Sequence, residues 1–559
     1  MGKDTFELGG QQWPKVTWWK MKGMRFVYLT LWAAMITSAT NGYDGSLMNG
    51  LEAIESWNES YNYPSGSTLG LLAAAMSIGS MLSIPVVPYV ADIMGRRAGV
   101  VIGCCIMLVG VVMVSIGYKI ALFVVGRIIL GFGLGIAQEC SPLLVTELVH
   151  PQHRAIYSTI YNSLWYVGSL IGACVALGLF RKLDLGYRRC LTVLRNKSYR
   201  GECLVLAGSV HVARNSIHLP TGVHLVSDNV AQGTNTDTHL NRTVPESPRW
   251  LISKGKLEQA KKVLAYVHAQ GDEDDALVNV EFDEIQQTLA LEKVFEGNNW
   301  SEFWSTAGNR HRLIILVSIG FFSQWSGNGI VSYFLPQVLK LIGITNSNTV
   351  LTINLILSAV NVVSATGICF FVEYFGRRKL FLTSSISMLI CYVSTTIALA
   401  RFSIASNDAA ARAVLAFIFL FYIAYNIGFS GMLVSYSSEI LPYRLRAKGL
   451  TIMFFCVDLS LWFNQYVNPI ALLKIEWKYY IVYCVFLLFE IFIVWKYYIE
   501  TKEIPLEEIV KKFDGDRAIL GGAAASEKIN QLSEQTETRV AMDSEKAMTT
   551  QVDIKSQYE

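Results

Sequence analysis

Two charged residues lie inside apolar stretches, where charge is costly. Asp44 lies within residues 25–47, and Arg127 lies within residues 120–142. An ionised carboxylate at the centre of a membrane-spanning helix costs about 2.5–3.5 kcal/mol on insertion scales, so Asp44 should face the protein interior and pair with Arg127. Desolvation makes a carboxylate hold a proton and a nearby cation makes it release one. The pair therefore predicts a group that binds a proton when the arginine withdraws. A permanent ion pair that only fixes helix register is the alternative.

A charged motif occurs twice along the chain. Its first copy consists of Asp92, Gly95, Arg96 and Arg97 followed by Glu147 and Arg154, and its second copy consists of Glu373, Gly376, Arg377 and Arg378 followed by Glu439 and Arg446. A single arginine pair would only help to orient the helices, because basic residues favour the cytoplasmic side. Two copies with acidic residues in the same order favour two homologous bundles in parallel orientation. They also indicate that the charged residues of each copy form a network with one another.

Further short motifs accompany the duplication. They are Asn41-Gly-Tyr43-Asp44-Gly, Gly126-Arg127, Pro245-Glu246-Ser-Pro-Arg249-Trp-Leu, Gln324-Trp325-Ser-Gly-Asn328-Gly and Glu500-Thr-Lys. Together with both charged motifs they resemble the sugar porter family of the major facilitator superfamily, and within it the fungal lactose, cellobiose and hexose permease-like branch. The resemblance covers most of residues 25–510. It implies an all-α polytopic membrane protein of two six-helix bundles that moves a mono- or disaccharide by alternating access.

The resemblance also implies how such transport is driven. In proton-coupled members of the family, the aspartate and arginine at the positions of Asp44 and Arg127 couple sugar movement to protons. Proton symport is therefore expected, with sugar and protons as the transported partners. Passive members can also carry an acidic residue at this position, so a passive sugar facilitator is the alternative.

Amide side chains are the predicted sugar ligands. Sugar hydroxyls donate and accept hydrogen bonds together, and amides do the same. The amides that match sugar-contacting positions of the family are Asn162, Gln324, Asn361 and Asn464, with Asn328 one residue before the usual asparagine. Tyr43, Trp325 and Tyr333 rank below them as aromatic rings that could stack on a sugar. For any single amide, an interhelical hydrogen bond is the alternative role.

Charged residues are also expected to form a gate on the cytoplasmic side. Salt bridges there would close the inner end, and breaking them would favour the inward-open state. The predicted gate consists of Asp92, Arg96, Arg97, Glu147, Arg154, Glu246, Arg249, Glu373, Arg377, Arg378, Glu439 and Arg446.

The elements that must position these residues are membrane-spanning helices. The 559 residues are 52% hydrophobic and 16% charged, which is too apolar for one soluble core, since such cores stop growing at roughly 250–300 residues. A span needs about 20 apolar residues. Eleven stretches qualify, near 25–47, 69–90, 98–117, 120–142, 155–179, 313–335, 351–372, 379–400, 413–434, 449–471 and 477–497. No cleavable signal peptide is expected before the first.

These spans define the expected domain plan. A cytoplasmic tail (1–24) precedes a first bundle (25–180), and a cytoplasmic linker (245–310) leads to a second bundle (311–500). Residues 501–559 are expected to include a disordered cytoplasmic tail, because from about 511 they are polar and lack an apolar face. We expect a monomer in the plasma membrane, with both termini in the cytoplasm.

Residues 181–244 do not fit this plan. They occupy the place of a sixth span, yet they hold seven arginines and two lysines, and their longest apolar run, 203–213, is about half a span. Without a sixth crossing, the two Gly-Arg-Arg loops would lie on opposite sides of the membrane, against the positive-inside rule. A histidine-rich metal or pH-sensing insertion is one explanation. We favour a gene read through an intron or in a shifted frame, which would leave an inactive product.

Other classes of function lack support in the sequence. No nucleophile and base arrangement, phosphate-binding loop or metal cluster is visible, so neither an enzyme nor a cofactor is expected. The ten cysteines are scattered without metal or disulfide spacing, and nucleic-acid binding has no support. A sugar sensor that does not transport is the alternative from another class. A long tail with repeated motifs would support it, and this tail shows no repeats.

Overall fold

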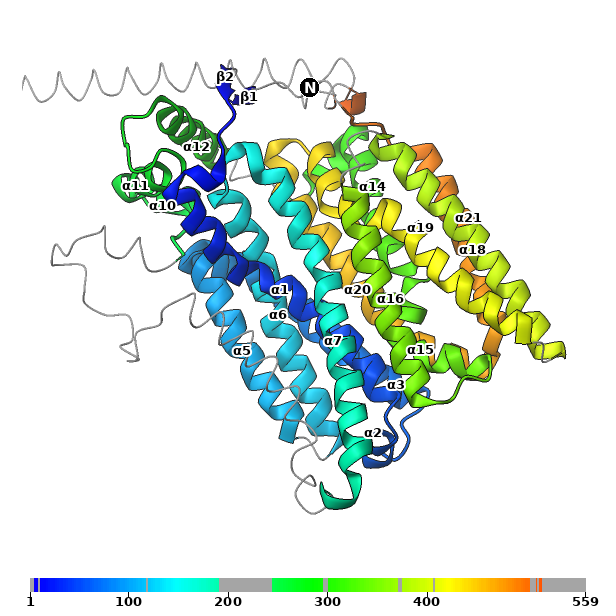
Figure 1. Cartoon of the computed structure of the whole chain (residues 1–559). Helices are drawn as coiled ribbons and strands as arrows, with labels where there is room; N and C mark the ends of the chain where they lie inside the picture. The colour runs from blue at the N-terminus through cyan, green and yellow to red at the C-terminus, as the bar shows by residue number, and fades with distance from the viewer. Residues whose placement is uncertain are drawn as a thin grey trace, which may run out of the picture.

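The computed structural model describes residues 5–8, 11–116, 119–190, 244–294, 300–369, 375–405, 408–502, 509 and 512–514. Their backbone is almost entirely helical (Figure 1). A two-stranded hairpin of β1 (Thr5–Leu8) and β2 (Gln11–Pro14) precedes the helices. Most of the interval 181–244 and nearly all of the predicted disordered tail lie outside the described residues.

The first bundle consists of five long helices and short connecting turns. The long helices are α1 (Lys22–Glu52), α3 (Ser67–Ser83), α5 (Arg96–Ile116), α6 (Ile120–Leu148) and α7 (Arg154–Cys190). The short elements are η1 (Trp18–Lys20), α2 (Glu55–Ser60), α4 (Val87–Tyr89), η2 (Val90–Met94) and η3 (Pro151–His153). Helix α6 packs between α5 and α3, and α1 packs along α7.

The second bundle follows a similar plan. Its helices are α14 (Ala307–Trp325), α15 (Asn328–Leu341), α16 (Ser347–Cys369), α18 (Arg377–Ala405), α19 (Asp408–Ile440), α20 (Tyr443–Ile475) and α21 (Tyr479–Tyr497), with short α13 (Glu302–Ser305) and η5 (Glu476–Lys478). Within it, α18 packs on α19 and α21, and α14 packs on α20. The two bundles meet where α3 lies along α20 and α7 lies along α16.

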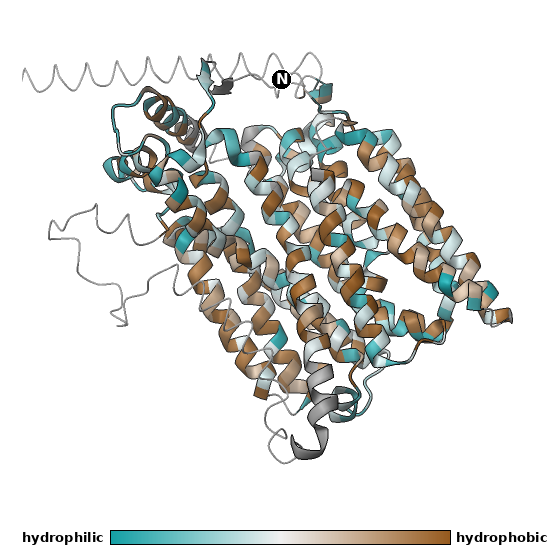
Figure 2. Cartoon of the chain, viewed as in Figure 1, coloured by the Kyte–Doolittle hydropathy of each residue, from teal (hydrophilic) through white to brown (hydrophobic). Residues whose placement is uncertain are grey.

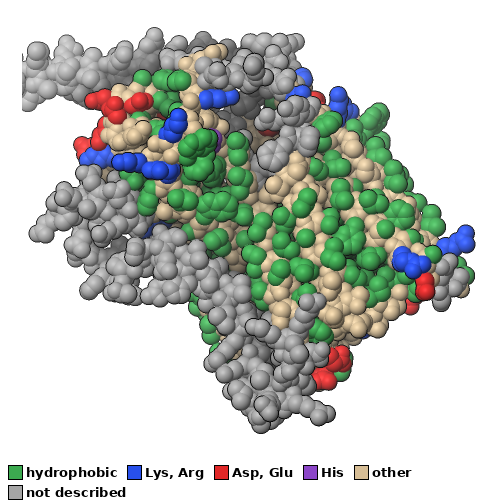
Figure 3. Space-filling view, in the orientation of Figure 1, with side chains coloured by type: hydrophobic (Ala, Val, Ile, Leu, Met, Phe, Trp, Pro, Cys, Tyr) green, Lys and Arg blue, Asp and Glu red, His purple; other side chains and the backbone are tan. Residues whose placement is uncertain are grey.

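The molecule has two distinct ends. The linker helices α10 (Pro248–Ser253), α11 (Leu257–His268) and α12 (Ala276–Val294) lie at one end, and α2 lies at the other (Figure 1). We call the first the motif end, because both Gly-Arg-Arg loops lie there, and the second the opposite end. Hydrophobic residues dominate the bundles between the ends (Figure 2), and charged side chains gather over the linker helices (Figure 3). This distribution suits a protein embedded in lipid.

Each of the eleven predicted spans overlaps a helix. Within the described residues, eight helical stretches are long and apolar enough to cross a membrane, or nine if the bent pair Ser67–Ser83 and Val87–Met94 counts as one. One of the eight, Lys448–Tyr497, holds most of α20 and all of α21. Helix α1 is not among them, because its Thr, Ser, Asn and Asp residues lower its hydropathy. The total of twelve spans stays a prediction.

The chain must cross from one end to the other within the anomalous interval. Phe180, near the end of α7, packs at the opposite end beside Ala53 and Leu355. Val244, where the described chain resumes, packs at the motif end against the cluster that contains Leu148 and Leu251. The crossing required by the two Gly-Arg-Arg loops therefore falls between these points, largely in residues outside the described part.

Sequencing the transcript across codons 176–246 tests the misreading hypothesis. We expect a spliced or reframed message that encodes about 20 consecutive apolar residues, because one further span must fit here. An uninterrupted message that encodes the printed stretch would refute the hypothesis.

Glycines let α1 and α7 approach closely. A Cβ atom on Gly42 would collide with the backbone carbonyl of Trp165, and one on Gly168 would collide with the carbonyl of Ala39. Both obstacles are backbone atoms, which cannot turn aside as a side chain can. Small residues at such contacts let membrane helices pack through their backbones. The position of Asp44 on α1 therefore depends on this contact.

Gly168→Ala should destabilise the first bundle by about 1–3 kcal/mol, the usual cost of overpacking a dense contact. The measurement is the melting temperature of detergent-solubilised protein, together with its elution profile in size-exclusion chromatography. Gly178→Ala is the matched control on the same helix, since a Cβ there meets nothing within 4 Å. Equal stability of the two variants would contradict the close contact.

Candidate functional site

A buried ion pair joins α1 to α6. Arg127 donates two hydrogen bonds to Asp44, from Nη1 to Oδ1 at 3.2 Å and from Nη2 to Oδ2 at 2.7 Å. The exposed fractions of the two side chains are only 6% and 13%. Phe123 and Met76 cover the guanidinium, with its central carbon 5.9 Å from the Phe123 ring centroid. The predicted partnership of Asp44 and Arg127 is therefore confirmed, whereas its role in coupling stays a proposal.

The second bundle reaches this pair through Tyr333 of α15. The tyrosine ring lies against α1, since a Cβ on Gly45 would stand 3.2 Å from its Cε1. Tyr333 lies within electrostatic range of Asp44 and Arg127, and its hydroxyl hydrogen-bonds with Gln465. The predicted aromatic residue thus lies at the interface of the bundles, beside the ion pair.

The break between α14 and α15 is held by tyrosine hydroxyls. Gly327 adopts a left-handed conformation with φ of 103°, so the helical hydrogen bonds cannot continue through it. The hydroxyls of Tyr425, Tyr392 and Tyr422 donate to the carbonyls of Ser323, Gly327 and Asn328 at 2.8, 2.7 and 2.9 Å. Broken helices at membrane depth need such partners. The three hydroxyls therefore satisfy carbonyls that the break leaves outside the helical hydrogen-bond pattern.

The predicted amide side chains differ in how many hydrogen bonds they already make within the protein. Asn464 donates to the carbonyl of Gln324 at 2.8 Å and accepts from Tyr483 at 2.9 Å. Asn361 accepts from Asn426 at 3.2 Å. These two therefore make the interhelical bonds that were their alternative role.

The other predicted amides make fewer or longer hydrogen bonds within the protein. The side chain of Gln324 makes one long contact, from Nε2 to the Ser323 hydroxyl at 3.4 Å. Asn328 donates to the Ser323 carbonyl at 3.2 Å, while its Oδ1 is buried and has no hydrogen-bond partner among the described residues. Asn162 is half-buried on α7. An unused buried acceptor such as Asn328 Oδ1 suits a ligand hydroxyl.

The other aromatic candidates occupy packed positions. Trp325 donates its indole N–H to the Ser460 carbonyl at 3.2 Å, and its ring lies against Phe463 and Phe486. Tyr43 is only 4% exposed on α1. The structure therefore places Trp325 within helix packing rather than on an open surface.

Two polar residues between the bundles were not predicted from the sequence. Asn426 of α19 accepts from the Tyr166 hydroxyl at 2.6 Å and so links the bundles. Gln465 of α20 accepts from the Ser77 hydroxyl at 2.6 Å, also across the bundles. Both amides stand inside predicted spans, and a search for every intramembrane amide would have found them without any motif.

The charged motifs form two similar networks at the motif end. In the first bundle, Arg96 contacts Glu147 at 3.3 Å, and Glu147 accepts a hydrogen bond from the Ser247 hydroxyl. In the second bundle, Arg377 contacts Glu439 at 3.0 Å, and Glu439 accepts from the Thr501 hydroxyl at 2.6 Å. Both networks stay within one bundle and the segments attached to it.

Each Gly-Arg-Arg loop also meets a second carboxylate. Glu246 accepts from the backbone N–H of Arg97 at 3.1 Å, and Glu500 accepts from that of Arg377 at 2.7 Å. Both carboxylates lie against the loop glycine, Gly95 or Gly376, where a Cβ would bring them into conflict. Glu500 therefore binds the second loop as Glu246 binds the first. Glu246 was among the predicted gate residues, whereas Glu500 was not.

Five further residues belong to the predicted gate. Asp92 contacts Arg96 at 3.4 Å, and Arg378 donates to the Trp495 carbonyl at 2.5 Å. Arg249 is half-buried on α10. Glu373 and the side chain of Arg446 lie outside the described residues.

Arg154 pairs with the linker rather than with Glu147. It contacts Glu281 of α12 at 2.5 Å, and Glu281 also accepts from His268 of α11 at 2.6 Å. The ring of His268 stacks edge-on against that of His150, with centroids 5.1 Å apart. His150, His268 and Glu281 are at most 3% exposed. This cluster, which we call the linker anchor, fastens α11 and α12 to the first bundle.

The charges in the linker anchor depend on burial and on one another. Burial alone would raise the pKa of Glu281, but His268 and Arg154 outweigh it and lower the pKa to about 2. Burial lowers the pKa of His150 to about 3, with a smaller contribution from His268. Both pKa values lie below the ordinary ones of 4.5 and 6.5. The folded anchor therefore resists protonation more than the unfolded chain does.

Acid should loosen the linker anchor. A group whose folded pKa is depressed contributes stability above its ordinary pKa and loses it as the pH falls. His150 should lose its contribution between about pH 6.5 and 3, and Glu281 between about pH 4.5 and 2. Hydrogen exchange in α11 and α12, corrected for intrinsic rates, should be faster at pH 5 than at pH 7.5.

His150→Asn should reduce this pH dependence, because it removes the group that titrates first. His311→Asn is the control, since His311 lies at the motif end of the second bundle, on α14, where it bonds to the Tyr497 carbonyl. Exchange in α11 and α12 that is equal at both pH values would contradict the assignment.

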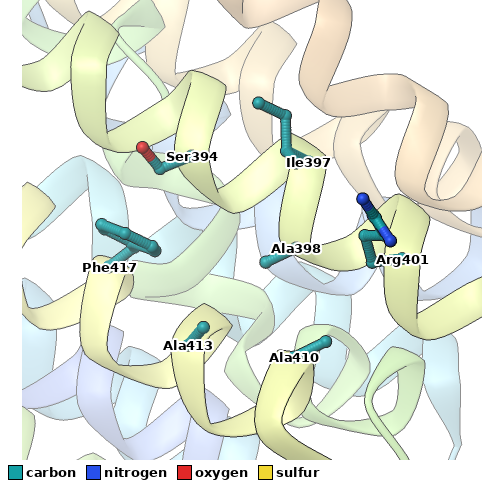
Figure 4. A pocket seen from close by; sticks show the side chains of 7 residues that line it. All are labelled: Ser394, Ile397, Ala398, Arg401, Ala410, Ala413 and Phe417. Atoms are coloured by element: carbon teal, nitrogen blue, oxygen red, sulfur yellow. The ribbon is translucent and has the colours of Figure 1, made fainter. Parts of the chain in front are cut away.

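A pocket on the second bundle lies away from these residues. It lies between α18 and α19, has a volume of about 430 Å³ and is lined by Ser394, Ile397, Ala398, Arg401, Ala410, Ala413 and Phe417 (Figure 4). None of these residues belongs to the ion pair or to the amide group. We therefore place the candidate site at the bundle interface and not in this pocket.

Comparison with known families gives a match over most of the chain. The family model described as "Sugar (and other) transporter" matches residues 30–194 and 240–513. The unmatched residues between the two stretches lie inside the interval 181–244. The match extends into this interval from both sides, over 181–194 and 240–244, and leaves 195–239 unmatched.

Curated relatives and solved structures agree with this match. The MFS-type transporter oryC of Aspergillus oryzae is 27% identical, covering 89% of this chain and 88% of its own. The high-affinity glucose transporter of Kluyveromyces lactis is 24% identical, covering 86% and 84%. The partially occluded inward-open xylose transporter XylE from E. coli superimposes with a TM-score of 0.66 at 21% identity, covering 86% and 99%.

A second XylE structure, a proton:xylose symporter bound to 6-bromo-6-deoxy-D-glucose, has the same TM-score and identity, covering 88% of this chain and 100% of its own. These likenesses show the major facilitator fold. The relatives are transporters and permeases rather than enzymes. The chain therefore belongs to the sugar transporter family of the major facilitator superfamily, as a multi-pass membrane protein that transports sugar.

Proposed function

We propose that this protein is a proton and sugar symporter. The observation that carries the proposal is the buried two-bond contact between Asp44 and Arg127, with Tyr333 of the other bundle beside it. An arginine within hydrogen-bond distance keeps a carboxylate ionised, and withdrawal of the arginine lets it accept a proton. A movement of α1 against α6 would therefore change the proton affinity of Asp44.

The neighbouring interface links that proton to the sugar. Tyr333 touches α1 on one side and Gln465 of α20 on the other, so protonation of Asp44 alters a contact between the bundles. In alternating access, an equilibrium shifts only when a ligand binds one state better than the other. A proton on Asp44 and a sugar at the interface would each favour the state in which the bundles close around them.

We propose that the sugar lies beside the break between α14 and α15. The unused Oδ1 of Asn328, the weakly engaged Gln324 and half-buried Asn162 would supply its first hydrogen bonds. Asn361 and Asn464 would contribute the hydrogen-bond donors and acceptors that their contacts within the protein leave unused. Trp325 and Tyr43 would line the walls of the sugar site. XylE in its solved structures is a xylose transporter and binds a glucose derivative, and a mono- or disaccharide is proposed here.

The motif end is proposed to face the cytoplasm, with both termini on that side, and the protein to be a monomer in the plasma membrane. Apart from the bond between Ser80 and Asp458, the bonds recorded between the bundles lie at midplane and toward the opposite end, as between Asn49 and the backbone of Ser332 and Leu335. This arrangement favours a state open toward the motif end. The twelve charged residues of the predicted gate would then hold each bundle rigid while the bundles rock.

A passive facilitator on the same scaffold is the second candidate. The close geometry of Asp44 and Arg127, at 2.7 Å, also suits a permanent ion pair that never exchanges a proton. A sensor without transport, or an inactive product of the anomalous segment, would show neither uptake nor coupling.

Adding sugar to cells that express the protein should make the surrounding medium more alkaline, because each sugar enters with a proton. Xylose, glucose, lactose and cellobiose form the test panel. Asp44→Asn should abolish alkalinisation and bring the internal to external sugar ratio to about 1, the value without coupling. Sugar exchange across the membrane should continue.

Asp408→Asn, at the exposed start of α19, makes the same chemical change away from the site and serves as the control. Uphill accumulation by Asp44→Asn would refute the role of Asp44. Downhill uptake by the unmodified protein without alkalinisation would favour the facilitator.

A further inference from the structure

Two carboxylates at membrane depth lie outside the proposed coupling pair. Glu139 belongs to α6 of the first bundle, and Asp458 belongs to α20 of the second. Glu139 lies within electrostatic range of Asp458, so the two interact across the bundle interface. Neither residue belongs to a motif that the sequence analysis singled out.

The described surroundings of this carboxylate pair contain no recorded counter-charge. Asp458 accepts a hydrogen bond from the Ser80 hydroxyl of α3 at 2.9 Å. The other titratable groups that interact with either carboxylate are uncharged when protonated: Cys140 beside Glu139 on α6, Tyr161 on α7 and Tyr333 on α15. The pair therefore differs from Asp44, which has Arg127 as its partner.

Water can reach both carboxylates. Glu139 and Asp458 lie among the packed helices of the two bundles, yet both side chains are only half-buried. Their partial exposure means that solvent reaches both side chains. In such a place a proton can arrive and leave without passing through hydrocarbon.

The pair lies on the motif-end side of Asp44 and Arg127. Helix α6 runs toward the motif end, and Glu139 follows Arg127 on it by about three turns. Helix α20 starts at the motif end, and Asp458 precedes Gln465 on it. The contacts that join the bundles farther toward the opposite end, such as Ser77 with Gln465, leave the pair near the point where the bundles part.

We propose that Glu139 and Asp458 share one proton and thereby control whether the bundles close at the motif end. This inference deepens the proposed symport, because the shared proton would be the second protonation step of the cycle. Two ionised carboxylates that are half-buried repel each other more strongly than they would in bulk water, so their ionisation pushes the bundles apart. When one holds a proton, it donates that proton to the other in a short charge-assisted bond, which draws the bundles together.

The consequence is an inner end that closes on proton uptake and opens on release. Asp44 responds to the withdrawal of its arginine, whereas this pair responds to the protons available in the space between the bundles. The two steps act at different depths on the same rocking motion. The direction of the effect follows from the placement of one carboxylate on each bundle.

The test measures the distance between the bundles and needs no sugar. Spin labels at Met94→Cys and Phe375→Cys, both exposed at the motif end, are introduced in a background without other reactive cysteines. Lowering the pH in lipid nanodiscs should shift the unmodified protein toward the shorter distance, by on the order of 5 Å for a rocking motion. Glu139→Gln should keep the shorter distance at every pH, because one neutral partner removes the repulsion.

Asp458→Asn should behave like Glu139→Gln and preserve the bond to Ser80, while Asp458→Glu should retain the pH shift. Asp283→Asn, exposed on linker helix α12, is the matched control and should leave the shift unchanged. If Asp458→Asn does not fold, the distances measured for Glu139→Gln decide whether the pair controls closure, since neutralising either residue has the same expected effect. A pH shift that survives Glu139→Gln would overturn the inference.

Transport measurements separate this inference from the proposed function. If sugar alkalinises the medium and Asp44→Asn abolishes the effect, the symport stands whatever the distances show. If the distance responds to pH through Glu139 and yet sugar moves no protons, the proton-controlled closure stands and the symport fails.

Discussion

Every polar group at membrane depth must find its partner inside the protein, and most of this structure follows from that constraint. The break at Gly327 frees backbone carbonyls, and tyrosine hydroxyls from α18 and α19 bind them. The charge of Asp44 is matched by Arg127. The helices are consequently held by a few specific polar contacts set in a close apolar packing.

The strength of these contacts differs within and between the bundles. The salt bridges recorded among the described residues, such as Arg96 with Glu147 and Arg377 with Glu439, each join parts of one half. The bonds recorded across the interface are single and mostly neutral, as between Ser77 and Gln465 or Tyr166 and Asn426. Such bonds are worth roughly 0.6 kcal/mol each in membrane proteins. Two firm bodies with a weak interface are suited to rocking against each other.

The linker helices are attached to the first bundle and should move with it. Glu281 and His268, from two linker helices, meet Arg154 and His150 at the base of that bundle. The duplicated carboxylates Glu246 and Glu500 brace each Gly-Arg-Arg loop in the same way. The internal repeat is thus visible in the contacts as well as in the sequence, and the first copy also carries the linker anchor.

The sequence by itself determined the helices, the duplicated charged loops and the pairing of Asp44 with Arg127, because hydropathy, short motifs and the cost of buried charge act locally or leave few partners. Only the tertiary structure decided that Arg154 binds Glu281, that Trp325 is packed against Phe463, and that Asp458 bonds to Ser80 of the other bundle. Those contacts depend on which faces of distant helices meet, and many faces of an apolar bundle are equally plausible from composition alone.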